Sequence, residues 1–197
     1  MTTNTSSRLV LGSTSPFRKA ILEKLGLPFE MAAPDIDETP LANETPEQLV
    51  CRLAEKKARA VATDYPNSLV IGSDQVAVID GKILGKPHTH ERAIEQLTNA
   101  SGKTVRFNTG LCLYNSDTDV AQCEAVPFDV VFRKLTASQI EHYLEKEKPY
   151  KCAGSFKSEA LGIALFEKLR GDDPNTLIGL PLIRLIAMLE NEGLHPI

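Results

Sequence analysis

The chain has 197 residues, of which 42% are hydrophobic and 24% charged, and its formal net charge is -4. This composition is typical of a soluble globular protein with enough apolar side chains for a sizeable core. The acidic balance argues against the broad basic surface that binds nucleic acid, although a local phosphate pocket is compatible with it.

The cysteines and the N-terminal residues predict where in the cell the protein is found. The four cysteines are widely spaced and form no Cys-x-x-Cys pair, so we expect free thiols in a reducing cytoplasm. Residues 2–7 are polar and only three large apolar residues follow them, which is too few for a signal peptide. No apolar run approaches the length of a membrane span, and we expect a cytoplasmic protein with no membrane contact.

The first predicted elements are a strand at 9–11 and a helix from Pro16 to about Leu25, joined by the polar turn Ser13-Thr14-Ser15. A strand that runs through a small-residue turn into a helix presents backbone N–H groups and a positive dipole end at one point. Arg18 adds a guanidinium suited to phosphate or carboxylate. The segment indicates an anion site, and an ordinary capped connection between strand and helix is the alternative.

A predicted loop and a predicted helix follow. Residues 31–44 carry four carboxylates, Glu38 among them, and two prolines, which is typical of a loop. Thr45 and Gln48 have the spacing of a capping box, so a helix is expected to begin at Pro46 and to keep an apolar face as far as Val61. Lys57 is a candidate phosphate ligand on this helix, with a solvated helix face as the alternative.

The middle of the chain supplies a carboxylate and a third basic residue. A strand is expected at 69–71, a second at 76–79, and a hairpin-type turn at Asp80-Gly81. Asp74 follows the first of these strands, where α/β folds place ligand-binding groups. Its carboxylate would hold a divalent cation or take a proton from water, unless it only caps the turn before Val76. Lys86, in a Gly-Lys-Pro turn, is a further candidate for phosphate.

The second half alternates in the same way. Helices are expected at about 89–99, 136–146 and 180–189, and strands at 104–114, 121–132 and 161–166, the first two as an antiparallel hairpin. The pattern predicts an α/β protein with a mixed sheet and flanking helices. We expect a single domain over 1–197, with a division into two lobes near residues 80–100.

Five segments together resemble the Maf family of nucleoside triphosphate pyrophosphatases. They occur in the family's order and span nearly the whole chain. They are Ser13-Thr14-Ser15-Pro16-Phe17-Arg18, Asp35-Ile36-Asp37-Glu38-Thr39-Pro40, Ile71-Gly72-Ser73-Asp74-Gln75-Val76, Gly85-Lys86-Pro87 and Gly154-Ser155-Phe156-Lys157-Ser158-Glu159. Ser-Asp-Gln at the catalytic position, where another branch has Ala-Asp-Thr, resembles the branch that acts on 7-methyl-GTP.

The resemblance implies a twisted sheet with two lobes around a substrate cleft, a divalent cation (Mg²⁺, Mn²⁺ or Co²⁺) and a nucleotide substrate, and it leaves open a homodimer. It assigns the role of proton acceptor to Asp74, and metal binding to Asp74 together with Glu38. The remaining assignments are substrate choice for Phe17, Gln75 and Glu159, and phosphate binding for Ser13, Ser15, Arg18, Lys57 and Lys86.

The chemistry of the base agrees with this assignment. N7-methylation gives guanine a positive charge, which an aromatic face such as that of Phe17 attracts by roughly 0.5–2 kcal/mol. The carboxylate of Glu159 would accept the N1–H and the exocyclic amine of guanine, and Gln75 would add an amide contact. Taken alone, Phe17 would be read as a core residue and Glu159 as a surface charge.

The hypothesis from the sequence is therefore hydrolysis of 7-methyl-GTP between the α- and β-phosphates, giving 7-methyl-GMP and diphosphate. In it, Asp74 activates the attacking water, directly or as a metal ligand. Two alternatives stay open: a pyrophosphatase for dTTP, UTP or another nucleotide, and a non-enzymatic regulator of cell division.

Overall fold

The computed structural model describes residues 8–197, and the polar stretch used above to argue against a signal peptide lies outside the described residues. The strands are β1 (Arg8–Leu11), β2 (Glu30–Met31), β3 (Ser68–Ile79), β4 (Lys82–Leu84), β5 (Thr104–Asn115), β6 (Val120–Phe132) and β7 (Phe166–Arg170). The α-helices are α1 (Pro16–Leu22), α2 (Pro46–Ala62), α3 (His90–Ala100), α4 (Ala137–Glu147), α5 (Asn175–Ile178) and α6 (Leu182–Asn191). Within the described part of the chain, no helix is both long and apolar enough to cross a membrane.

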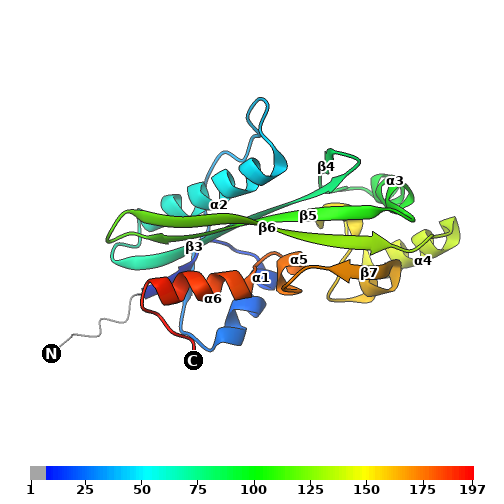
Figure 1. The fold of residues 1–197 in the computed structure, drawn as a ribbon. Helices are drawn as coiled ribbons and strands as arrows, with labels where there is room; N and C mark the ends of the chain where they lie inside the picture. The colour runs from blue at the N-terminus through cyan, green and yellow to red at the C-terminus, as the bar shows by residue number, and fades with distance from the viewer. Residues whose placement is uncertain (1–7) are drawn as a thin grey trace.

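The seven described strands form one mixed sheet, in the order β2-β1-β3-β5-β6-β7. β4 pairs with β3 on the same edge as β1 but farther along the strand. β1 runs parallel to β2 and β3, whereas β3, β5, β6 and β7 are successively antiparallel. Helices lie on both faces of the long strands, with α2 on one side and α1 and α6 on the other (Figure 1). The predicted α/β class with a mixed sheet and flanking helices is confirmed.

Alternation along β3 assigns its side chains to the two faces. Val70 packs against α2, and the side chains on either side of it, Leu69 and Ile71, pack in the cluster that includes α1 and α6. A further apolar cluster fills the end of the sheet near α3 and α4. One sheet carries all three clusters. The expected division into two lobes near residues 80–100 stays a prediction.

Two glycines let α2 approach the sheet closely. A Cβ on Gly72 of β3 would lie 1.9 Å from the carbonyl oxygen of Ala54, and one on Gly110 of β5 would lie 2.0 Å from that of Val50. The backbone of α2 therefore rests on the sheet where both strands lack a side chain. This contact fixes the height of Lys57, on the same helix, above β3.

The structure corrects two expectations about elements. Residues 68–79 form one continuous strand rather than two, because Gly72 serves the packing of α2 and does not break the strand. The strand expected at 161–166 is a 3₁₀ helix (Leu161–Leu165), and β7 begins only at Phe166, where pairing with β6 starts. A short apolar run does not distinguish strand from helix.

The cysteine prediction is also corrected for two residues. Cys112 of β5 lies directly opposite Cys123 of β6, and the two form a disulfide. The 11-residue separation hides this pairing in the sequence, because it depends on the register of the hairpin. Cys51 and Cys152 are free thiols, as expected.

Candidate functional site

The candidate site lies in a notch along one edge of β3. β1 pairs with this edge from Ser68 to Ile71, and β4 pairs with it from Ala77 to Ile79. In the described part of the chain, no strand pairs with residues 72–76 on this edge. Asp74 therefore lies in mid-strand and not at a strand end, which corrects its predicted position and excludes its reading as a turn cap. Asp74 is nevertheless open to a ligand, because β1 ends before it reaches this part of β3.

A cleft of about 860 Å³ opens at this notch, a volume within the usual range for small-molecule sites. All ten residues predicted from the sequence line it, although they come from six separate segments of the chain. They are Ser13, Ser15, Phe17, Arg18, Glu38, Lys57, Asp74, Gln75, Lys86 and Glu159.

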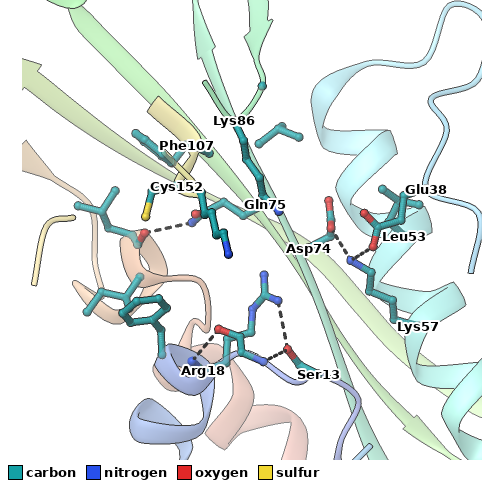
Figure 2. A pocket seen from close by; sticks show the side chains of 18 of the residues that line it. Ser13, Arg18, Glu38, Leu53, Lys57, Asp74, Gln75, Lys86, Phe107 and Cys152 are labelled. Carbon is teal, nitrogen blue, oxygen red and sulfur yellow. Dashed lines mark hydrogen bonds and ion pairs between the residues drawn. The ribbon is translucent and has the colours of Figure 1, made fainter. Parts of the chain in front are cut away.

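Lys57 stands between two carboxylates on one wall of the cleft (Figure 2). Its Nζ donates to Asp74 Oδ1 at 2.7 Å and lies 2.8 Å from Glu38 Oε1. The Lys57 side chain is only 8% exposed, so the alternative of a solvated helix face is wrong. An ammonium in this place draws both carboxylates to one point at the rim of the cleft.

Arg18 and Ser13 form a second group in the cleft, apart from Lys57 and its two carboxylates (Figure 2). Arg18 Nε donates to the carbonyl oxygen of Gly179 at 2.8 Å, and its Nη1 donates to Ser13 Oγ at 3.4 Å. Burial lowers the pKa of Arg18, with Asp74 and Glu38 opposing the shift, and an arginine stays cationic in proteins. Ser15 Oγ accepts from the backbone N–H of Arg18 as the N-cap of α1. This confirms the capped connection, and the partly buried cation of Arg18 lies beside the cap.

The proposed base-contacting residues line the same cleft. Phe17 is 41% exposed, which rules out the alternative of a core residue. Glu159 is exposed, so the description as a surface charge is accurate, and it lines the cleft as well. Gln75 Nε2 donates to Thr109 Oγ1 at 2.8 Å and to the carbonyl oxygens of Thr176 and Leu177 at 2.9 and 3.2 Å.

Aromatic packing holds the segment that carries Glu159. The Phe156 ring makes edge-to-face contacts with Phe107, Phe132 and Phe166 at centroid distances of 5.3, 5.6 and 4.8 Å. Phe156 is buried and lies three residues before Glu159. Contacts of this kind add stability beyond the area that they bury, so the loop is fixed to the sheet.

Sequence reasoning missed several residues of the site. Thr109, Thr176, Leu177 and Gly179 hold Gln75 and Arg18, three of them through backbone carbonyl oxygens. A backbone carbonyl leaves no mark in the sequence, so no signal could have identified these three. Cys152 also lines the cleft, and burial raises the pKa of its thiol.

The donor set allows a test for a metal ion. Among residues 8–197 there is no group of three or more His, Cys, Asp or Glu side chains that could hold one. The protein offers two carboxylates, Asp74 and Glu38, which already share one cation, the ammonium of Lys57. Mg²⁺ is commonly held by one or two carboxylates together with substrate phosphates and water. The residues present fit that pattern.

Two known proteins match nearly the whole of this chain. The 7-methyl-GTP pyrophosphatase of Nitrosococcus oceani is 63% identical over 185 residues, which cover 94% of this chain and 93% of that protein. The 7-methyl-GTP pyrophosphatase of Colwellia psychrerythraea is 59% identical over 186 residues, with coverage of 94% and 93%.

A solved structure shares the fold. The Ham1 protein of Staphylococcus aureus superimposes with a TM-score of 0.55 at 16% identity, covering 94% of this chain and 99% of that one. At this identity the likeness concerns the fold alone. The family model described as Maf-like protein matches residues 8–192. The chain therefore belongs to the Maf-like protein family.

Proposed function

We propose that the protein hydrolyses 7-methyl-GTP to 7-methyl-GMP and diphosphate. The observation that carries this proposal is the position of Asp74 and Gln75 as neighbours in β3 at the notch. Successive side chains of a strand point to opposite faces, so one strand supplies a carboxylate next to Lys57 and an amide next to Thr109. Two relatives of high identity that are named for this substrate support the choice.

The phosphate end of the cleft would work through charge. Arg18, Lys57 and Lys86 approach it from three segments and would neutralise charge that develops on the phosphates during hydrolysis. The attacking water would give its proton to Asp74 while the bond between the α- and β-phosphates breaks and diphosphate leaves. The ammonium of Lys57 would orient the carboxylate of Asp74 for this transfer.

A divalent cation belongs to the proposal. Asp74 and Glu38 would hold Mg²⁺, Mn²⁺ or Co²⁺ together with phosphate oxygens. When bound, such an ion supplies Lewis acidity toward the phosphates. Lys57 then has a second consequence, because its charge holds the two carboxylates together before the nucleotide arrives.

The base end of the cleft would select the methylated purine. The exposed ring of Phe17 offers a face to a flat cation, and the carboxylate of Glu159 offers acceptors to the N–H groups of guanine. A negative carboxylate favours the methylated, positively charged base over GTP. A cytoplasmic location, a homodimer and the lack of direct nucleic-acid binding stay predictions.

A diphosphate-release assay tests the proposal. 7-methyl-GTP, GTP, dTTP and UTP would be compared at equal concentration with Mg²⁺, Mn²⁺ or Co²⁺ added in turn. We expect the highest kcat/KM for 7-methyl-GTP and no release after chelation of the metal. A preference for dTTP or UTP would contradict the assigned substrate, and no release from any nucleotide would favour a non-enzymatic role.

A further inference from the structure

The side-chain amide nitrogen of Gln75 contacts three groups of the protein itself. Gln75 and Thr109 are direct partners in the antiparallel pairing of β3 and β5, so their side chains emerge side by side on the same face. Thr109 is fully buried, and its Oγ1 lies 2.8 Å from Gln75 Nε2 and 3.0 Å from the carbonyl oxygen of Thr176. Gln75 Nε2 also reaches the carbonyl oxygens of Thr176 and Leu177.

Counting donors and acceptors fixes the direction of every bond in this group. A carbonyl oxygen only accepts, so the single proton of the Thr109 hydroxyl goes to Thr176. The hydroxyl oxygen must then accept from Gln75, which requires the amide nitrogen at that place. Turning the amide over would set its oxygen against two carbonyl oxygens, Thr176 and Leu177, and only the Thr109 hydroxyl could then donate to it, by giving up its bond to Thr176.

One polar atom of the Gln75 side chain is left over. Its Nε2 donates to protein acceptors, whereas its Oε1 has no hydrogen bond to any residue between 8 and 197. Gln75 itself lines the cleft. The side chain therefore presents an acceptor, and no donor, to whatever binds there.

We propose that Thr109 is a positioning residue for substrate choice, which fixes the Gln75 amide so that Oε1 accepts from the base. This inference rests on the proposed function, in which Gln75 contacts the base. Guanine offers two adjacent N–H donors, N1–H and the exocyclic amine, whereas uracil and thymine offer one, between two acceptors. A fixed acceptor at Gln75, in the same cleft as the carboxylate of Glu159, matches the donors of guanine.

The test compares Thr109→Val with Thr109→Ser in the diphosphate-release assay. Valine keeps the shape of the side chain and suits a strand, but it has no hydroxyl, whereas serine keeps the hydroxyl. For Thr109→Val we expect KM for 7-methyl-GTP to rise roughly three- to tenfold, the size of one lost neutral hydrogen bond. We expect kcat to change less than about twofold, because the contact exists before and during hydrolysis. Thr109→Ser should restore KM.

A second background separates positioning from packing. In a Gln75→Ala protein the amide is gone, so adding Thr109→Val should leave KM for 7-methyl-GTP unchanged. KM for UTP should change little in either background, and thermal melting would confirm the fold of each variant. If Thr109→Val fails to fold, Thr109→Ala in both backgrounds answers the same question.

The outcomes are distinct. An unaltered KM in folded Thr109→Val, or the same rise in the Gln75→Ala background, would overturn the positioning role while wild-type turnover of 7-methyl-GTP upholds the proposed function. A wild-type protein that does not hydrolyse 7-methyl-GTP would overturn the proposed function itself. A Gln75→Ala protein with unaltered substrate preference would overturn the contact on which the inference rests.

Discussion

Lys57 determines how a substitution of either cleft carboxylate, Asp74 or Glu38, affects the stability of the protein. Its ammonium contacts both Asp74 and Glu38, so it keeps one carboxylate partner when the other is changed. An asparagine at position 74 would still offer a carbonyl oxygen to Lys57 at the place of Oδ1. The loss of charge at Asp74 therefore leaves no unpaired group in the wall of the cleft.

We predict from this that Asp74→Asn abolishes diphosphate release, by at least about a hundredfold in kcat, because an amide does not take the proton of the attacking water. The free energy of unfolding in urea should fall by no more than about 1 kcal/mol. Asp64→Asn, an exposed site at the end of α2, is the matched control. Near-normal turnover by the Asp74 variant would remove this residue from the mechanism.

Glu159 also lines the cleft and carries a charge that suits a cationic base. We predict that Glu159→Ala lowers the preference for 7-methyl-GTP over GTP by about tenfold, since a charged hydrogen bond contributes more than a neutral one. The ratio of kcat/KM for the two nucleotides measures this effect. Glu167→Ala, at an exposed position of β7, should leave the ratio as it is. The same ratio in both variants would contradict the assigned role.

The contact of α2 with the sheet sets the distance between Lys57 and Asp74. We predict that Gly110→Ala lowers the free energy of unfolding by about 3 kcal/mol, because the new Cβ would meet backbone and not a flexible side chain. Urea denaturation measures the loss, and turnover should fall with it as α2 moves away. Gly85→Ala, where an added Cβ would meet no atom within 4 Å, is the control for stability. Unchanged stability would show that α2 tolerates a wider separation.

The acidic loop before α2 is tied down by Glu44. Its carboxylate accepts from Arg52 at 2.5 and 2.7 Å and from the backbone of Leu41 at 3.0 Å. The hydrogen bonds from Arg52 are the main cause that lowers the pKa of Glu44 from 4.5 to about 2. A lowered pKa in the folded protein stabilises it above the unfolded value and loses this effect as pH falls through the folded value.

We therefore predict that the stability contributed by Glu44 is complete above about pH 4.5 and disappears toward pH 2. Thermal melting of wild type and Glu44→Gln across this range measures it. The variant should melt at a lower temperature at pH 7, and the two proteins should converge at the acid end. A constant difference across the range would show that Arg52 does not depend on the charge of Glu44.

At the level of elements, the capping and turn signals in the sequence were reliable, whereas short apolar runs were not. The capping boxes at Thr45 and Thr136 begin α2 and α4, and the Asp80-Gly81 turn joins β3 to β4. These features depend on residues within a few positions of one another. The short helix α5 and the disulfide were missed, because both depend on packing and register between distant segments.

For the whole molecule, the sequence predicted which residues gather but not where. The ten residues were grouped by their resemblance to family motifs, and the structure brings all of them to one cleft. Their common location follows from the notch between β1 and β4, which no single segment encodes. Contacts between residues as distant as Arg18 and Gly179 depend on the whole fold.

The segment from Asn175 to Gly179 has a consequence for the order in which the site forms. Its carbonyl oxygens accept from Arg18, Ser73 and Gln75, so residues made early in translation receive their anchors from backbone made near its end. Until that segment has left the ribosome, the arginine and the amide have no fixed direction. The nascent chain thus carries every candidate catalytic side chain well before it carries a working site, and synthesis itself delays the onset of activity.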